Sequence, residues 1–130
     1  MEVGRRHLLY DLWVDDPTLL QRVEPLRAML LSATRDSGAT VLADHFHQFE
    51  PHGVTGVLLL AESHLSIHTW PEEGLITVDV FTCGTMDTTL ILQRLRDALS
   101  PRREKLTTIL RGQASVSRRT GEPGSRRLLY

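Results

Sequence analysis

The 130-residue sequence predicts an α+β fold, in which an antiparallel β-sheet carries two helices on one face. Six segments have the alternating or short continuous apolar pattern of strands, whereas two have the apolar spacing of helices. Short turns join several strands in succession, which favours antiparallel pairing. Because a chain of this length has no third layer for the other face, we expect a two-layer sandwich that dimerises.

The predicted elements follow the order β-α-β-β-β-β-α-β. The first strand covers residues 7–14. Pro25 interrupts the helical spacing that follows, so we expect a short first turn and then a main helix over 25–37, ended by Gly38. The apolar run VTGVLLLA at 54–61 predicts a strand that is buried on both faces. The other elements are strands over 39–49, 63–70, 75–83 and 105–112 and a helix over 87–99.

Composition separates a folded domain over residues 1–112 from a polar segment over 113–130, which we expect to be a flexible tail. The 15 basic and 16 acidic side chains nearly balance, which does not favour a nucleic-acid partner. No apolar segment approaches the ~20 residues of a membrane span, and the N-terminus does not resemble a signal peptide. With a single cysteine, Cys83, the chain forms no internal disulfide. We therefore expect a cytoplasmic protein without a membrane partner.

The turn PEEG at residues 71–74 predicts which side chains meet across a hairpin. If Trp70 pairs with Leu75, alternate residues of both strands fall on one face of the sheet. That face gathers Ser66, His68, Asp79 and Cys83, with the Glu62–Ser63 peptide bond at its edge. The pattern is compatible with an acid–base cluster around Ser63 and also with a water-facing side of a strand. His64 is expected to point away from the cluster.

The segment ESHLSIHTWPE at 62–72 closely resembles the characteristic motif of the S-adenosylmethionine decarboxylase family, in its short bacterial and archaeal form. The resemblance covers roughly residues 4–112 and also includes GRRHLL at 4–9, SGAT at 37–40, PHGVTGV at 51–57 and VDVFTCG at 78–84. It implies a self-processing proenzyme that uses neither a metal nor pyridoxal phosphate. His45 and His47 form an HxH pair, but no third ligand at metal spacing accompanies them.

The resemblance implies that the chain cuts itself between Glu62 and Ser63, giving residues 1–62 and 63–130. Ser63 would become a covalent pyruvoyl group, the cofactor that forms a Schiff base with the substrate amine. The reaction implied is conversion of S-adenosylmethionine to its decarboxylated form plus CO₂, which supplies the aminopropyl donor for spermidine synthesis. The implied assembly is a homodimer of cleaved protomers.

Three further residues receive catalytic roles from the resemblance. His68 is the implied processing base, since imidazole exchanges protons near neutral pH. Cys83 is the implied proton donor, which suits a thiol because thiols are mostly protonated at neutral pH. Thr55 is the processing hydroxyl, where relatives commonly have serine. The implied substrate-binding residues are Phe49, Ser66, Trp70 and Glu72.

Two alternatives remain open from the sequence. Four acids stand where relatives often carry other residues, namely Asp15, Asp44, Glu50 and Glu73. Extra acids near a cleft would favour a second positive charge on the substrate, and hence a pyruvoyl-dependent decarboxylase of L-ornithine or L-arginine. The second alternative is an unprocessed, non-catalytic partner subunit.

Overall fold

The computed structural model describes residues 4–112, so the predicted tail over 113–130 lies outside the described residues. The chain forms six strands, two α-helices and two short 3₁₀ turns. These elements are β1 (Arg5–Trp13), η1 (Pro17–Leu20), α1 (Val23–Asp36), β2 (Val41–Gln48), β3 (Val54–Leu60), β4 (Ser63–Trp70), η2 (Pro71–Glu73), β5 (Leu75–Thr82), α2 (Thr88–Leu99) and β6 (Arg103–Arg111).

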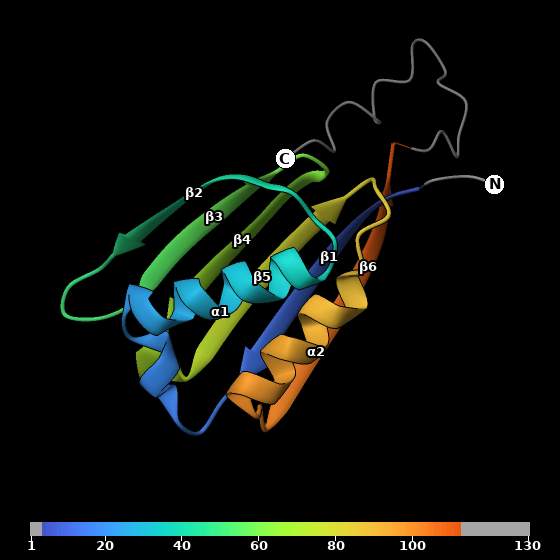
Figure 1. Cartoon of the computed structure of the whole chain (residues 1–130). Helices are drawn as coiled ribbons and strands as arrows, with labels where there is room; N and C mark the ends of the chain where they lie inside the picture. Colours follow the sequence, from blue (N-terminus) through green and yellow to red (C-terminus); the bar gives the residue numbers. More distant parts are fainter. Residues whose placement is uncertain (1–3, 113–130) are drawn as a thin grey trace, which may run out of the picture.

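The strands form one antiparallel sheet in the order β2-β3-β4-β5-β1-β6. Both helices lie on the same side of this sheet, so the domain has two layers (Figure 1). The predicted fold class and element order are confirmed. The opposite side of the sheet, which we call the open face, has no covering element in the described part of the chain.

Local sequence signals set the helix boundaries. Glu24 has extended torsion angles, so the helical conformation of α1 begins at Pro25, as predicted. The carboxylate of Asp87 caps α2 by accepting a hydrogen bond from the backbone nitrogen of Leu90 at 3.2 Å. Ser100 ends α2 in a left-handed conformation with a φ of 45°.

The hydrophobic core lies between the helices and the sheet. Alternate residues of the central strands point into it, together with the apolar stripes of both helices. Fully buried side chains include Leu12, Leu26, Leu30, Leu58, Leu65, Ile67, Ile76, Val78, Ile91 and Leu95. Each such side chain contributes about 1.5–3 kcal/mol relative to an exposed one.

The prediction that β3 is buried on both faces is wrong for the single chain. Val54 and Leu58 are buried under the helices, but Val57 is 40% exposed and Leu59 52% exposed. The side chains alternate because the helices cover one face only, so the apolar run of β3 leaves hydrophobic residues on the open face.

Tyr10 joins β1 to β6 and α2 through a polar group at the edge of the core. Its hydroxyl donates a hydrogen bond to Glu104, which also accepts hydrogen bonds from Arg96 Nε at 3.3 Å and Nη2 at 3.2 Å. Burial, reinforced by the Glu104 carboxylate, raises the pKa of Tyr10 to about 12. The hydrogen bond from Tyr10 and the Arg96 guanidinium together lower the pKa of Glu104.

Gly56 supplies a test of packing within the sheet. A β-carbon at this position would overlap the ring of Phe46, which faces it from β2. We expect Gly56→Ala to lower the free energy of unfolding by about 1–3 kcal/mol, the usual cost of overpacking. Gly4→Ala is the matched control, because its added β-carbon has its nearest neighbour, Leu110 Cδ2, at 3.8 Å. Urea unfolding measures both variants, and equal losses would contradict the overlap.

The raised pKa of Tyr10 predicts a loss of stability in alkali. The unfolded chain releases the phenol proton near the ordinary pKa of 10.0, and the folded chain near 12. The contribution of Tyr10 is therefore complete below pH 10 and falls away between pH 10 and about 12. Tyr10→Phe should flatten this part of the profile of unfolding free energy against pH. A fall of the same size in both proteins would show that another group is responsible.

Candidate active site

The open face carries the polar side chains of β4 and β5 in the predicted register. Ser66 lies opposite Asp79 and His68 opposite Thr77, so the expected pairing is confirmed. The Ser66 hydroxyl donates a hydrogen bond to Asp79 Oδ2 at 3.2 Å. Cys83 follows the last residue of β5, in alternation with Asp79, and so belongs to the same face.

The Glu62–Ser63 peptide bond lies between β3 and β4, beside the end of β5. The Glu62 carbonyl oxygen accepts two hydrogen bonds from Cys83, one from the backbone nitrogen at 3.4 Å and one from Sγ at 3.3 Å. Cys83 is exposed, so it is not the small core hydrophobe that cysteine often is. Two donors on one oxygen polarise this carbonyl, an arrangement that stabilises negative charge if it develops there.

Ser63 has an unusual backbone conformation at this bond. Its φ is 153°, a value that residues with a β-carbon rarely adopt, and such conformations cost about 1–3 kcal/mol. Its Oγ lies 3.5 Å from His64 Nδ1. Backbone strain and a nearby imidazole therefore coincide at the bond that the sequence motif singled out.

The expectation that His64 points away from the cluster is wrong. His64 is opposite Phe81 in the β4–β5 pairing, and the two ring centroids are 5.8 Å apart. Positions 64, 66 and 68 alternate along one strand, so His64 shares the open face with Ser66 and His68. The alternation of side chains between the two faces of a strand was sufficient to place His64 on the open face.

The side chain of Glu62 is also held in place. Its Oε1 accepts a hydrogen bond from the backbone nitrogen of Thr40 at 3.2 Å. Gly84 lies against it, because a β-carbon at position 84 would be 2.8 Å from Glu62 Cγ. The glycine after Cys83 thus permits the close approach of the two segments that meet at the Glu62 carbonyl.

Thr55 and His68 form a second polar pair on the open face. They are opposite each other on β3 and β4, and Thr55 Oγ1 lies 3.1 Å from His68 Nδ1. The hydrogen bond fixes the orientation of the imidazole ring. It also reserves Nδ1, so that Nε2 is the ring nitrogen that remains for other chemistry.

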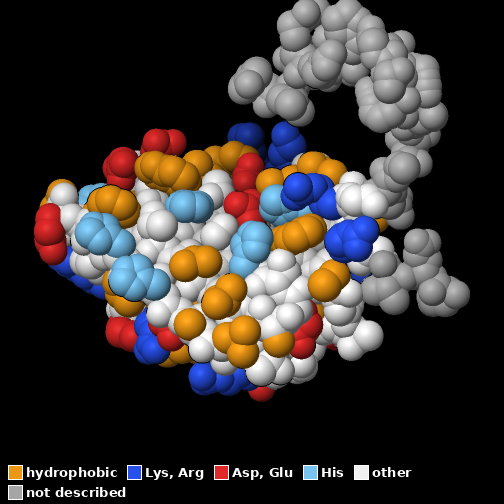
Figure 2. All heavy atoms as spheres, turned by 90° about the horizontal axis from the view of Figure 1, so that it is seen from above, with side chains coloured by type: hydrophobic (Ala, Val, Ile, Leu, Met, Phe, Trp, Pro, Cys, Tyr) orange, Lys and Arg blue, Asp and Glu red, His pale blue; other side chains and the backbone are white. Residues whose placement is uncertain are grey.

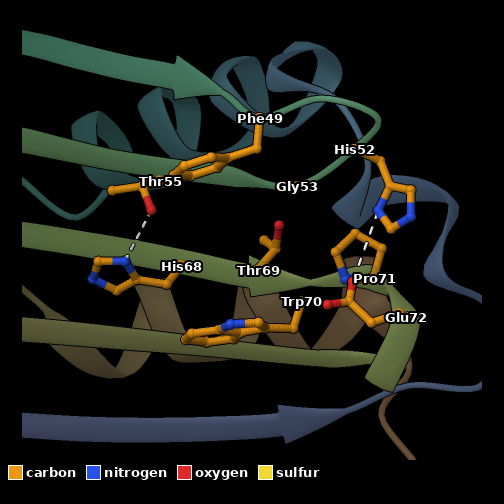
Figure 3. A pocket seen from close by; sticks show the side chains of 9 residues that line it. All are labelled: Phe49, His52, Gly53, Thr55, His68, Thr69, Trp70, Pro71 and Glu72. Atoms are coloured by element: carbon orange, nitrogen blue, oxygen red, sulfur yellow. Dashed lines mark hydrogen bonds and ion pairs between the residues drawn. The ribbon is translucent and has the colours of Figure 1, made fainter.

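A cavity of about 300 Å³ lies next to this pair, at the end of β4. Phe49 and Trp70 stand on opposite sides of it, with Thr55 and His68 toward one end (Figure 3). The cavity therefore has the form of a slot between two aromatic side chains. Its lining residues are Phe49, His52, Gly53, Thr55, His68, Thr69, Trp70, Pro71 and Glu72.

The predicted site residues divide into two groups. Those that line the cavity are Phe49, Thr55, His68, Trp70 and Glu72. Those that lie outside its lining are Glu62, Ser63, Ser66 and Cys83. The sequence reasoning assigned no role to His52, which lines the far end of the cavity, 3.9 Å from Glu72. The only signal for His52 was its place in the PHG turn between two strands that carry predicted site residues.

Three of the four unusual acids are paired with arginines, and none of the four lines the cavity. Asp44 Oδ2 lies 2.7 Å from Arg27 Nε, and this hydrogen bond holds the pKa of Asp44 below its ordinary value. Further ion pairs join Asp15 to Arg102 at 3.1 Å and Glu50 to Arg22 at 3.6 Å. Glu73 is outside the cavity lining as well. These acids therefore do not make the cavity more negative by direct contact.

Within residues 4–112, no three His, Cys, Asp or Glu side chains are arranged to hold a metal ion. No helix in the same range is long and apolar enough to cross a membrane.

The fold and the site define a two-layer α+β protein with an unusual Glu–Ser bond at the start of β4 and a cavity between two aromatic side chains at the end of the same strand. The chain belongs to the S-adenosylmethionine decarboxylase family. The sequence model of this family, described as S-adenosylmethionine decarboxylase, matches residues 6–112. The predicted family is confirmed, and the predicted activity, that of a carboxy-lyase, is the one that gives the family its name.

Several proteins resemble this chain. The S-adenosylmethionine decarboxylase proenzyme of Aquifex aeolicus is 55% identical over 78 residues, which are 60% of this chain and 58% of that protein. The proenzyme of Parasynechococcus marenigrum is 45% identical over 122 residues, 91% of this chain and 94% of that protein. The crystal structure of adenosylmethionine decarboxylase from Aquifex aeolicus superposes with a TM-score of 0.80 at 40% identity, and the match covers 92% of this chain and 100% of that one. The sequence match to the first relative thus spans less than two thirds of its length.

Proposed function

We propose that this chain is a self-processing, pyruvoyl-dependent decarboxylase of S-adenosylmethionine, which releases CO₂ and the aminopropyl donor for spermidine synthesis. The observation that carries the proposal is the strained Glu62–Ser63 bond, whose carbonyl accepts both hydrogen bonds from Cys83. The aromatic slot at the other end of β4 supports a nucleoside substrate.

Processing begins with addition of Ser63 Oγ to the carbonyl carbon of Glu62. The C–N bond of the peptide then breaks and an ester forms, with the amine of Ser63 set free. Loss of the α-proton of Ser63 and cleavage of its Cβ–O bond release Glu62 as a carboxylate. The dehydroalanine that remains tautomerises, takes up one water and loses ammonia, which gives the pyruvoyl group at the start of residues 63–130. Backbone strain at Ser63 raises the energy of the uncut chain and so favours the first step.

The residues around the bond fit these steps. The backbone nitrogen and Sγ of Cys83 stabilise the oxyanion that forms on Glu62. His68 is the proposed base that takes the α-proton of Ser63, at Nε2 with its Nδ1–H donated to Thr55 Oγ1. Ser63 and His68 are five residues apart on β4, about 16 Å, so in the proposed homodimer the proton passes from Ser63 of one copy to His68 of the other. The proposed role of Thr55 is therefore to hold the ring orientation of His68.

The site is also suited to the finished cofactor. The chain carries Ser63 at the first position of β4, where cleavage leaves it as a new N-terminus next to the thiol of Cys83. A pyruvoyl group supplies a carbonyl that condenses with an amine and accepts the electron pair left by CO₂. Cys83 Sγ–H provides the proton that replaces the lost carboxylate.

The cavity favours S-adenosylmethionine over a basic amino acid. Phe49 and Trp70 offer faces on which an adenine ring stacks, and Glu72 is placed to accept hydrogen bonds from ribose hydroxyls. L-Ornithine and L-arginine have no ring to place between aromatic walls. Three of the four unusual acids that suggested a basic substrate form ion pairs with arginines of the chain itself.

The open face supports a homodimer. Its large exposed hydrophobic residues are Phe49, Val57, Leu59, Trp70 and Ile109. Figure 2 shows hydrophobic and histidine side chains interspersed on the surface seen from above. A second copy of the chain, laid against this face, would bury these residues and enclose the site. A cytoplasmic location stays a prediction.

Intact mass under denaturing conditions tests the processing step. We expect two chains divided at Glu62–Ser63, the second with a pyruvoyl end, and one uncut chain for Ser63→Ala. Thr55→Ser should still cleave, whereas Thr55→Val should slow cleavage by roughly 10²-fold or more, because it removes the hydrogen bond that orients His68. A wild-type chain that stays uncut on long incubation would instead favour the non-catalytic partner subunit.

Release of labelled CO₂ from carboxyl-labelled substrates tests the choice of substrate. We expect release from S-adenosylmethionine and none from L-ornithine or L-arginine, because only the first fills the slot between Phe49 and Trp70. Ser63→Ala is the control, since it lacks the cofactor but keeps the cavity. Release from either basic amino acid but not from S-adenosylmethionine would overturn the proposed substrate.

A further inference from the structure

The first step of the proposed processing needs a base, and one imidazole lies at the reacting hydroxyl. Ser63 Oγ must lose its proton as it bonds to the carbonyl carbon of Glu62, because a neutral hydroxyl is a weak nucleophile. His64 Nδ1 lies 3.5 Å from this oxygen. The contact is at the long end of the hydrogen-bond range, but catalytic contacts often shorten only as the reaction proceeds. His64 is therefore within reach of the proton that has to move.

The other ionisable groups around Ser63 are engaged elsewhere or are too far away. The Glu62 carboxylate already accepts a hydrogen bond from the backbone just before β2, at 3.2 Å. The thiol of Cys83 donates to the Glu62 carbonyl oxygen at 3.3 Å, where it serves the oxyanion. His68 is five residues farther along β4, about 16 Å away. In the described part of the chain, only the side chain of His64 forms a hydrogen bond with Ser63 Oγ.

The ring of His64 is positioned by strand pairing on the open face. His64 on β4 and His7 on β1 both lie opposite Phe81 of β5, one on each side of it. The ring centroid of Phe81 is 5.8 Å from that of His64 and 5.6 Å from that of His7. The two histidines thus share an aromatic neighbour, but β5 separates His7 from the strand that carries Ser63. The contact with the reacting hydroxyl distinguishes His64 from its counterpart.

We propose that His64 is a further catalytic residue, the general base for Ser63 Oγ in the first step of self-cleavage. This inference rests on the proposed function. With the ring proton on Nε2, Nδ1 accepts the hydroxyl proton while Oγ bonds to the Glu62 carbonyl carbon and the π electron pair of that carbonyl moves to its oxygen. When the carbonyl re-forms and the C–N bond breaks, the same proton passes from Nδ1 to the amine nitrogen of Ser63. His64 ends the step neutral, and the ester forms without a co-reactant.

Two histidines then serve the two proton transfers of processing. His64 belongs to the same chain as the bond that is cut, whereas His68 reaches the α-proton of Ser63 from the other copy of the proposed homodimer. Loss of His68 should stop the reaction at the ester, and loss of His64 should slow formation of that ester. The two roles can therefore be measured separately.

Trapping of the ester with hydroxylamine measures the first step alone. In His68→Ala the ester keeps its α-proton, so hydroxylamine cuts it into residues 1–62 and a second chain that begins with serine. With hydroxylamine in excess, the cleavage rate followed by intact mass is the rate of ester formation. We expect His64→Ala or His64→Gln, added to this background, to lower the rate about 10²-fold, the usual size of general-base catalysis. His7→Ala is the matched control and should leave the rate unchanged, because it removes the other histidine beside Phe81.

The substitution Ser63→Cys distinguishes base catalysis from a merely structural role of His64. A thiol, with an ordinary pKa of about 8.5, loses its proton far more readily than a hydroxyl, so formation of the thioester needs a base less. In the Ser63→Cys, His68→Ala background, we expect His64→Ala to lower the hydroxylamine cleavage rate only a few-fold. Equal losses in the Ser63 and Ser63→Cys chains would overturn the role of His64 as a base.

Failure of the proposed function gives a different result from failure of this inference. Self-cleavage of the wild-type chain, combined with an undiminished trapping rate on His64→Ala, would overturn the role of His64 and leave the proposed function standing. A wild-type chain that stays whole, with or without hydroxylamine, has no ester at Glu62–Ser63. That result would overturn the proposed self-processing together with the role of His64.

Discussion

The antiparallel register between β4 and β5 is the constraint on which the site depends. Side chains alternate along a strand, so a slip of one residue would exchange the core face and the open face of β4. Two features hold the register: Leu65 and Ile67 must stay under the helices, and the turn before β5 closes through Gly74, whose φ is 64°. The backbone nitrogen of Val14 donates to Gly74 O at 2.8 Å, which fixes the turn to the end of β1. The same register that buries the core therefore brings Cys83 to the Glu62 carbonyl.

Because the helices cover only one face of the sheet, the residues that stabilise the fold and the residues of the proposed site lie on opposite faces. The helices and the inner side chains of the strands supply the hydrophobic burial, and the open face carries polar, aromatic and exposed aliphatic side chains. This division explains why hydrophobic residues such as Val57 and Leu59 remain exposed in a single chain. It also places the Glu62–Ser63 bond and the cavity on the sheet, which holds side chains more accurately than loops do.

Two local unfavourable features lie at the proposed site. Ser63 adopts a rare backbone conformation, and His52 keeps a buried nitrogen without a partner. Other such features lie outside the site: His7 Nε2 and Thr34 Oγ1 are also buried without a hydrogen-bond partner among residues 4–112, and Ser100 has a φ of 45°. Proteins tolerate such local costs where they serve function, because the stability of the rest of the domain offsets them. In the proposed mechanism, cleavage relieves the backbone strain at Ser63.

The sequence by itself determined the class of fold, the order of the elements, the β4–β5 pairing and the family. Hydrophobic periodicity, turn residues and a dense local motif carry that information along the chain, within short stretches. The tertiary structure alone decided which groups meet between distant segments. It placed both donors of Cys83 on the Glu62 carbonyl, Thr55 on His68, and His52 beside Glu72 at the end of an aromatic slot. It also paired Asp44 with Arg27, which no local pattern indicated. Those contacts depend on side-chain directions and turn geometry in three dimensions, and a one-dimensional pattern does not contain them.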